Sequence, residues 1–322
     1  MKIGRNFANL LYANYLDDGK KRKLLSEKIS VADMDVEVEI KAKADIAGQI
    51  VVAGTLDIDH VELDGTIPNP YLKFDRDQKR EASEVSISND VSLSLLLPHT
   101  FIASGLCSPD EYSRRLAVKL QKRYIEFASG IGCKYCVAHS GWVPFYHASG
   151  KSLERVHSNL IKSLVELAKF ASDRSIALHL KNNPAPSLVF TGVGEIVNVL
   201  KRVIERGVNL SFCFDIGYWL SHIEASGSVP SRPELIIEQI PTRLIKELHL
   251  SDYVPKEGFF CPPLHEQLGL LKRENLRRYA ELVRKKKAKL IVVSTTLGPE
   301  DRVNRGDEIL REETRYLRSF FR

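Results

Sequence analysis

The stretch Leu178-His179-Leu180-Lys181-Asn182-Asn183-Pro184 is the point at which this chain passes from a buried strand into a polar loop. The apolar run 176–180 is typical of a buried strand, and the lysine, asparagines and proline that follow are typical of a loop. A helical pattern precedes the strand at about 153–170, and another follows it at about 193–206. Because α/β proteins place their chemistry at the carboxyl ends of such strands, Lys181 is the first candidate site residue.

The same alternation of short strand and helix continues over the whole chain. The strands are short and apolar on both faces, as parallel strands covered by helices are. Alternation of this kind over about 300 residues predicts a single (β/α)₈ barrel, an α/β fold. The predicted strands lie at about 2–7, 59–65, 91–97, 134–138, 176–180, 210–214, 247–250 and 290–293.

We expect one domain over residues 1–322, and the least regular segment is about 12–43. Alternating valines and isoleucine favour a strand at 36–40, yet a helix at 37–56 fits the same residues nearly as well. This segment is therefore expected to hold an insertion in the barrel or an oligomer contact.

Composition indicates a soluble globular protein, with 43% hydrophobic and 27% charged residues. No apolar run approaches the roughly 20 residues that cross a membrane, and the first residues lack the apolar core of a signal peptide. Five cysteines, an odd number in 322 residues, argue against a disulfide framework and for a reducing compartment. We therefore expect a cytoplasmic location and no membrane contact.

The net charge of +6 and the pI of about 8.9 are compatible with an anionic substrate or with weak nucleic-acid contact. The basic residues form two short runs, 20–23 and 284–289, and no continuous stripe. The second run closes a helix just before a strand, which is the barrel end opposite an active site. Both runs are interpreted as solvated surface.

Polar residues of the kinds that bind divalent metals or transfer protons stand at the predicted strand ends. In a barrel these ends share one rim, so the side chains are expected to lie close together. We assign four other histidines, including one strand-end residue, to ordinary core or surface positions: His99, His147, His179 and His222. The strand-end residues are Arg5, Asn6, Glu62, Asp64, His99, His139, Lys181, Asp215, Tyr218, His249, Asp252 and 294–296.

The order of the strand-end motifs resembles that of the xylose isomerase-like barrel superfamily, over about residues 46–296. That superfamily contains sugar and sugar-phosphate isomerases and epimerases, and also DNA-repair enzymes of the endonuclease IV type. The motifs that carry the resemblance are Val61-Glu62-Leu63-Asp64, Val137-Ala138-His139, Leu180-Lys181-Asn182-Asn183, Phe214-Asp215-Ile216-Gly217-Tyr218, Leu248-His249-Leu250-Ser251-Asp252 and Leu264-His265-Glu266-Gln267-Leu268-Gly269.

The resemblance implies a divalent metal held by a Glu ending strand five, an Asp ending strand six, a His in strand seven and a Glu ending strand eight. Asp215 and His249 stand at the second and third of these positions. Lys181 and Ser294 stand where the two glutamates belong. The resemblance therefore predicts a metal site that has lost half of its ligands.

The nuclease branch of the superfamily adds further histidines and an aspartate. His139 and His265 match two of these positions, whereas Leu96, Tyr218 and Pro263 replace others. The resemblance to a nuclease is therefore incomplete.

The loss of two carboxylates and the gain of an ammonium raise the local formal charge by about +3, which disfavours a bound cation. Opposite charges a few ångströms apart attract by about 4 kcal/mol at an effective dielectric constant of 20. Lys181 could therefore pair with Asp215 and take the place of the ion, and we expect no metal cofactor. Three other roles stay open for Lys181: binding an anionic substrate group, acting as an amine nucleophile, or none at all.

The candidate catalytic residues are Lys181, Asp215 and His249. The candidate substrate-binding residues fall into two groups. His139, Trp142 and His265 lie after strand four or in a late loop, where the aromatic ring of Trp142 could wall a pocket against a sugar. Ser294 and Thr295 follow strand eight, where barrels often hold a phosphate.

The first expected function is a sugar or sugar-phosphate isomerase or epimerase-like barrel with an altered, metal-free site, acting on a carbohydrate or phosphorylated ligand. One alternative is a barrel without catalysis that binds a ligand or a partner. Another is an endonuclease IV-like protein that binds or repairs DNA, favoured by the net charge and disfavoured by the missing ligands. If the protein is an enzyme, we expect an isomerase or epimerase first and an AP endonuclease-like hydrolase second. Oligomeric state stays open.

Overall fold

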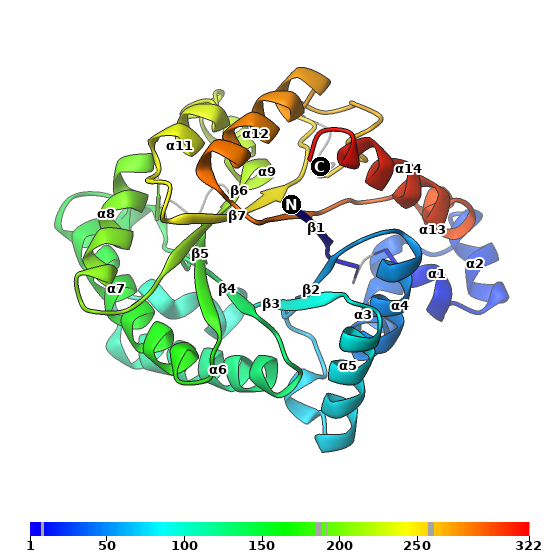
Figure 1. Ribbon diagram of the computed structural model, residues 1–322, viewed down its shortest axis with the longest axis horizontal. Coiled ribbons are helices and arrows are strands. Elements are labelled where there is room, and N and C mark those ends of the chain that lie inside the picture. The colour runs from blue at the N-terminus through cyan, green and yellow to red at the C-terminus, as the bar shows by residue number, and fades with distance from the viewer. Residues whose placement is uncertain (8–9, 185–188, 191, 257–260, 322) are drawn as a thin grey trace.

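Residues 1–7, 10–184, 189–190, 192–256 and 261–321 are described by the structure, a computed structural model. Within them, eight parallel strands close into a barrel in chain order, with helices around its outside (Figure 1). The predicted α/β barrel is confirmed. The strands are β1 (Lys2–Arg5), β2 (His60–Asp64), β3 (Ser92–Leu96), β4 (Tyr135–His139), β5 (Ala177–Lys181), β6 (Ser211–Asp215), β7 (Ile245–Leu250) and β8 (Leu290–Val293).

The helices pack their apolar stripes against the outer faces of the strands, and those predicted at about 153–170 and 193–206 are found at Gly150–Ser172 and Val193–Ile204. Asp110 caps the helix Glu111–Gly130 by accepting a hydrogen bond from the Ser113 amide at 2.7 Å. The α-helices are α1 (Tyr12–Tyr15), α2 (Asp18–Leu25), α3 (Val31–Ala44), α4 (Ile46–Thr55), α5 (Arg76–Ser88), α6 (Glu111–Gly130), α7 (Gly150–Ser172), α8 (Val193–Ile204), α9 (Ile216–Leu220), α10 (His222–Ser226), α11 (Pro233–Gln239), α12 (Arg273–Lys286), α13 (Pro299–Asn304) and α14 (Gly306–Arg318), and the 3₁₀ helices are η1 (Tyr71–Lys73), η2 (Phe101–Cys107) and η3 (Phe145–His147).

The register of the strands decides which side chains meet inside the barrel. His139 pairs with Lys181, Lys181 with Cys213, and Asp215 with His249 along four consecutive strands. Because side chains alternate between the two faces of a strand, residues two apart on one strand point into the same interior. The register therefore brings the strand-end groups of β4 to β7 to one level of the barrel.

Residues 36–40 are helical, so the predicted strand there is wrong, and the alternative helix at 37–56 is interrupted. Helix α3 ends at Ala44 and α4 begins at Ile46. Asp45 separates them because its carboxylate accepts hydrogen bonds from the Gly48 amide at 2.8 Å and from the Tyr15 hydroxyl at 2.6 Å. The side chain thus caps the second helix and ties α1 to the same point.

Replacing Asp45 by alanine will lower the free energy of unfolding by about 1–2 kcal/mol, because the helix cap is lost and the Tyr15 hydroxyl loses its acceptor. Urea denaturation followed by circular dichroism measures this change. Equal stability of the variant and the parent protein would show that the cap contributes nothing.

Helices α1 to α3 build a small hydrophobic cluster of their own beside the barrel. Its buried members are Leu16, Leu24 and Val38, and Val303 of α13 packs against it. The long connection between β1 and β2 therefore packs against α13, the helix that follows β8, next to the carboxyl rim of the barrel.

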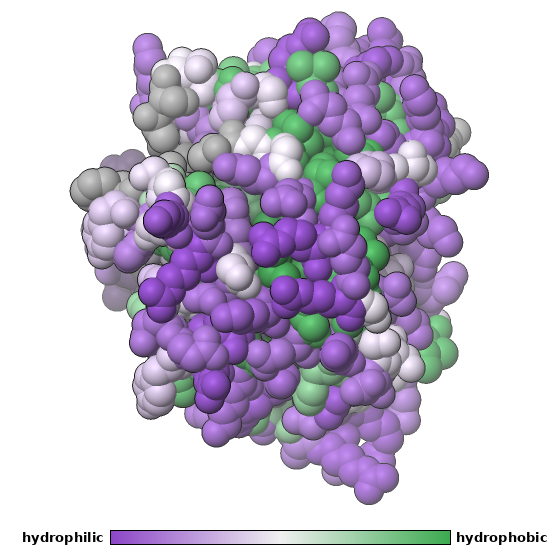
Figure 2. Space-filling model, turned by 90° about the vertical axis from the view of Figure 1, so that its left-hand side faces the viewer, coloured by the Kyte–Doolittle hydropathy of each residue, from purple (hydrophilic) through white to green (hydrophobic). Residues whose placement is uncertain are grey.

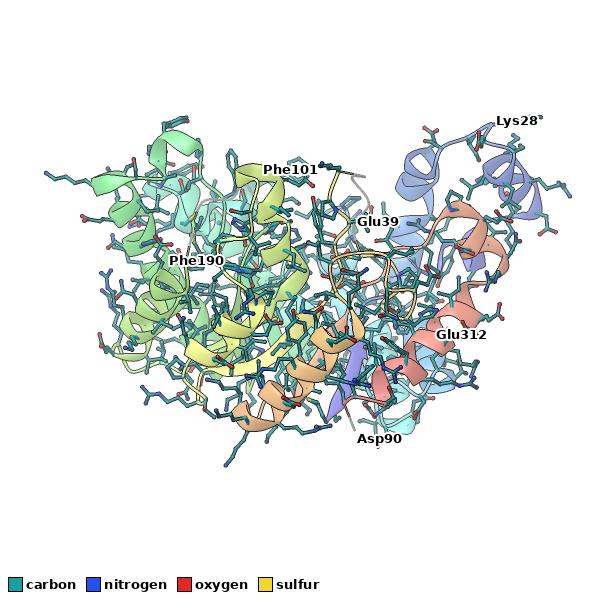
Figure 3. The ribbon with its side chains drawn as sticks, turned by 90° about the horizontal axis from the view of Figure 1, so that it is seen from above. Lys28, Glu39, Asp90, Phe101, Phe190 and Glu312 are labelled. Atoms are coloured by element: carbon teal, nitrogen blue, oxygen red, sulfur yellow. The ribbon has the colours of Figure 1, made fainter. Side chains whose placement is uncertain are left out.

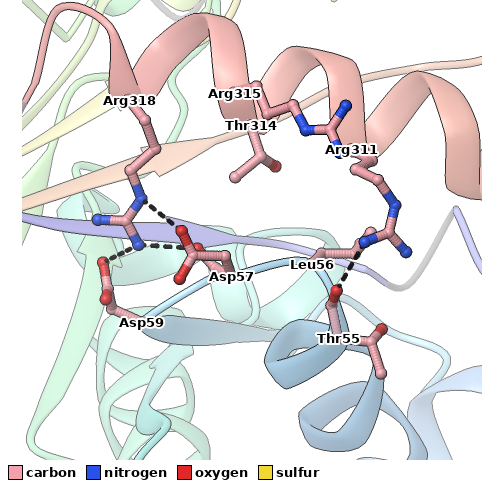
Figure 4. Close-up of a pocket in the computed structure, with 8 residues that line it drawn as sticks. All are labelled: Thr55, Leu56, Asp57, Asp59, Arg311, Thr314, Arg315 and Arg318. Atoms are coloured by element: carbon pink, nitrogen blue, oxygen red, sulfur yellow. Dashed lines mark hydrogen bonds and ion pairs between the residues drawn. The ribbon is translucent and has the colours of Figure 1, made fainter.

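The last helix ties the barrel closed at its opposite end. Arg318 of α14 bonds the Asp59 carboxylate at 2.9 Å and lies 3.4 Å from that of Asp57, and Arg311 donates to the carbonyl of Thr55 at 3.0 Å (Figure 4). These contacts line a cleft of about 540 Å³. Two arginines of this cleft are already bound by the loop before β2 and by the end of α4. We therefore interpret the cleft as part of the packing between α14 and the barrel.

The surface is mainly hydrophilic on the face shown in Figure 2, with hydrophobic side chains lying between the polar ones. Among the described residues, no helix is both long enough and apolar enough to cross a membrane.

Candidate functional site

A cavity of about 390 Å³ lies at the carboxyl ends of the strands. Among the described residues, its wall holds four carboxylates, from Glu39, Glu62, Asp64 and Asp215, and a single cationic side chain, that of Lys181. The predicted residues Ser294 and Thr295 also line it. The cavity is therefore polar and carries more negative than positive groups.

Lys181 lies at the centre of this site. Its Nζ is 2.8 Å from Oδ2 of Asp215 and 2.8 Å from Nδ1 of His249. The ammonium also lies 4.4 Å from the ring centroid of Tyr218, a favourable cation–π distance. The three predicted catalytic residues, each at most 3% exposed, thus form one contact group.

The surroundings of Lys181 keep its amine charged. Burial is the largest single effect and opposes the charge, but the Asp215 carboxylate together with Tyr218, Glu62 and Cys213 outweighs it and raises the pKa of Lys181 above its ordinary value. A nucleophilic amine needs a lowered pKa, so the geometry disfavours Schiff-base chemistry at Lys181. The side chain is a fixed cation in a buried place.

His249 links Lys181 to two glutamates that the sequence did not single out. Its Nε2 lies 3.1 Å from Oε2 of Glu62 and 3.2 Å from Oε1 of Glu247. Because an ammonium can only donate to Nδ1, we assign the ring proton to Nε2, where Oε1 of Glu247 accepts it. The other oxygen of Glu247 lies 2.6 Å from Nδ1 of His179.

The alternation of side chains along a strand could have revealed these partners. Glu247 precedes His249 by two residues, and His179 precedes Lys181 by two, so each pair faces the barrel interior. Glu62 was recognised only as a strand-end residue. The buried chain of polar groups thus extends from the cavity down into the barrel.

The family's divalent metal does not fit the residues at this place. Lys181 Nζ stands within hydrogen-bond distance of both remaining ligand positions, Asp215 and His249, and Ser294 offers no carboxylate at the fourth position. An ammonium and a divalent ion cannot share these donors, since both are cations that need the same lone pairs. We therefore derive no chemistry from a metal here.

One other group of described residues has metal-ligand spacing. Donor atoms of Cys213, Glu247 and His249 lie within 4.8 Å of one another. Burial raises the pKa of the Cys213 thiol to about 12, and both nitrogens of His249 already face Lys181 and the two glutamates. This group does not offer three free ligands.

His99 and His139 form a stacked pair, with ring centroids 3.9 Å apart. Burial, followed by the nearby Lys181, lowers the pKa of His99 to about 4, and burial lowers the pKa of His139 well below its ordinary value. Both rings are therefore neutral near pH 7. His139 lies 3.1 Å from the Asn183 side-chain oxygen, behind His99. His99, which we assigned to an ordinary core or surface position, lines the cavity.

Three predicted substrate-binding residues do not line the cavity: Trp142, His265 and His139, the last of which stacks on His99. Trp142 is 51% exposed and lines a separate groove beside η2, with its amide bonded to the Ser104 carbonyl. His265 turns outward, and its Nε2 lies 3.5 Å from a carboxylate oxygen of Glu312. Figure 3 shows Glu312 on the outer side of the molecule. The directions of both loops are set by these distant contacts.

Thr295 lies at the cavity, but its hydroxyl is already engaged. It accepts a hydrogen bond from Arg5 at 2.8 Å and donates to Glu313 at 2.7 Å. Arg5 and Glu313 also form a buried ion pair at 2.9 Å. The hydroxyl therefore serves the contact between β1, β8 and α14, which weakens the expectation of a phosphate at this loop.

Comparisons with known proteins agree with this architecture. Among solved structures, a D-psicose 3-epimerase determined in the presence of D-fructose matches with a TM-score of 0.69 at 13% identity, covering 100% of this chain and 99% of that chain. D-Psicose 3-epimerase with D-tagatose from Clostridium cellulolyticum H10 matches with a TM-score of 0.68 at 14% identity, covering 100% and 98%. The IolI protein with a bound zinc atom matches with a TM-score of 0.63 at 14% identity, covering 100% and 98%.

At these identities the structural matches establish the fold alone. No curated protein matches the sequence. The model of the family described as xylose isomerase-like TIM barrel matches residues 39–320, which is most of the chain. This protein therefore belongs to the xylose isomerase-like TIM barrel family.

Proposed function

We propose that this protein is a sugar isomerase or epimerase-like barrel whose site acts without a metal ion. The observation that carries the proposal is the position of the Lys181 ammonium, 2.8 Å from both Asp215 and His249. A fixed cation at the mouth of the barrel supplies the positive charge that the reaction needs. The structural matches to sugar epimerases support the substrate class.

Isomerisation or epimerisation beside a carbonyl removes a proton from carbon and returns it to the neighbouring carbon or to the other face. Negative charge develops on the carbonyl oxygen when the proton leaves, and a preorganised cation stabilises that charge. Lys181 has this role in the proposal, and Asp215 holds its ammonium in place.

The proton itself requires an acid–base group in reach of the cavity. Glu62 lines the cavity, and its Oε2, which has no hydrogen-bond partner, lies 3.1 Å from Nε2 of His249. In the proposal the Glu62 carboxylate accepts the proton from the substrate carbon and returns it to the neighbouring carbon on the same face of the enediolate, while the hydroxyl proton of the first carbon passes to the former carbonyl oxygen.

The charges of the site disfavour the DNA-binding alternative. Binding to a nucleic-acid backbone requires clustered cations. Four carboxylates and a single lysine line this cavity. The alternative without catalysis remains an outcome of the experiments below.

Metal analysis of the purified protein tests the central claim. Mass spectrometry for zinc, manganese, iron and magnesium will find less than a tenth of an ion per chain, because Lys181 holds the place of the ion. Treatment with EDTA will leave the melting temperature and any sugar-induced shift unchanged. One tightly bound divalent ion per chain would overturn the proposal.

Hydrogen exchange tests for turnover. Proton NMR in D₂O follows deuterium uptake next to the carbonyl of D-fructose, D-tagatose and their phosphates, with the substrate in large excess over the protein. We expect uptake with at least one of these sugars, with or without EDTA. Sugar binding without deuterium uptake would favour the non-catalytic barrel. The absence of both binding and uptake would refute the sugar function.

A further inference from the structure

A second buried ammonium, that of Lys43, lies on the β2 side of the cavity. Lys43 comes from α3, in the elaborated connection between β1 and β2, and is 0% exposed. Its Nζ lies 2.5 Å from a carboxylate oxygen of Glu39 and 3.3 Å from one of Asp64. It also donates to the carbonyl and hydroxyl oxygens of Thr66, at 2.7 and 2.9 Å.

The carboxylates that Lys43 holds are themselves part of the cavity wall. Glu39, Asp64 and Thr66 all line the cavity that contains Lys181. The Glu39 side chain is 20% exposed, so it is open to a ligand while its ammonium partner is not. Figure 3 shows Glu39 nearer the middle of the molecule than Lys28, which stands at the outer edge.

The barrel topology separates this group from Lys181. Strands β2 and β6 are four positions apart in a closed barrel of eight, so their carboxyl ends face each other across the mouth. Asp64 ends β2 and Asp215 ends β6. A ligand whose carbonyl lies at Lys181 would therefore extend its other end towards Glu39 and Asp64.

We propose that Glu39 determines substrate specificity by binding hydroxyl groups at the end of the sugar remote from Lys181, and that Lys43 is the positioning residue that aims it. A carboxylate accepts strong, charge-assisted hydrogen bonds from sugar hydroxyls. Two carboxylates share one ammonium here, so the group keeps a net negative charge and repels a phosphate. This inference rests on the proposed sugar function and narrows it to unphosphorylated ketoses.

Glu39→Gln tests the inference while keeping the hydrogen bond to Lys43, because the amide oxygen can still accept it. Isothermal titration calorimetry with D-fructose, D-tagatose and D-fructose 6-phosphate gives the affinities. We expect the variant to bind the preferred free ketose about tenfold more weakly, since a charged hydrogen-bond partner is lost. The ratio of phosphorylated to free sugar affinity will rise by at least the same factor.

Glu84→Gln is the matched control, because it also removes the carboxylate of an i,i+4 ion pair. Its partner is Arg80 on the exposed face of α5. This control will bind all three sugars as the parent protein does.

Lys43→Met tests the positioning role through the sign of its effect. It leaves two uncompensated carboxylates, so the ratio of phosphorylated to free sugar affinity will fall, opposite to the change in Glu39→Gln. A structural role alone would not give opposite signs.

The outcomes separate this inference from the function on which it rests. If the parent protein binds a free ketose but Glu39→Gln leaves the affinity ratio unchanged, the specificity role is overturned and the proposed function stands. If no sugar in the panel binds the parent protein, both are overturned.

Discussion

Lys181→Met will lower the free energy of unfolding by about 3–5 kcal/mol, because removing one partner of a buried ion pair leaves the other charge uncompensated. Asp215 is only 2% exposed and lies 2.8 Å from the lysine ammonium. The same change will reduce any deuterium uptake by sugar about 10²–10³-fold, as expected when a preorganised charge at the developing oxyanion is lost. Urea denaturation and NMR measure the two effects.

The double variant Lys181→Met, Asp215→Asn separates the effect of losing the ion pair from the effect of leaving the buried Asp215 charge uncompensated. It removes both charges, so it will be more stable than Lys181→Met alone, by at least about 1 kcal/mol. Its exchange activity will stay as low as that of the single variant. If Lys181→Met costs less than about 1 kcal/mol, the ammonium does not lie in the buried position on which the site depends.

Lys181→Glu combined with Ser294→Glu will create a divalent metal site that the parent protein lacks. The pair restores carboxylates at the two ligand positions where this chain departs from its family, next to Asp215 and His249. With the ammonium gone, carboxylate and imidazole donors surround one place, as manganese and zinc require. Metal at 100 times its dissociation constant will stabilise the variant by about 2.7 kcal/mol.

Ser294→Glu alone is the control for this gain of function. It adds a carboxylate but keeps the Lys181 ammonium, which will pair with the added charge and exclude the ion. Metal titration followed by differential scanning calorimetry distinguishes the two variants. Equal metal affinity of the single and double variants would show that Lys181 does not exclude the ion, and no metal binding by the double variant would show that the remaining donors do not converge.

The barrel and the centre of its site could be predicted from local patterns. Apolar runs ending in loop chemistry located the strands, and parallel strands of one barrel must end at one rim. That is enough to bring Lys181, Asp215 and His249 to the same place. Strand position predicts that they lie near one another, and the register and distances of the structure show that they are in contact.

The rest of the site was beyond local patterns because contacts distant in the chain decide it. Loop directions depend on such contacts, so Trp142 and His265 are held away from the cavity, although their positions follow the strand ends. The Thr295 hydroxyl is bound by Arg5, 290 residues earlier in the chain.

Hydrophobic periodicity acts locally, so the sequence by itself determined the parallel barrel, and its resemblance to the superfamily implied a lysine at a metal-ligand position. Only the tertiary structure decided that Glu62 lies beside His249 and that α3 brings Glu39, paired with Lys43, to the same cavity. Such groups meet across the barrel interior or by the packing of an added helix. The spacing of residues in the sequence does not predict these contacts, because they depend on how the whole chain folds into the closed barrel.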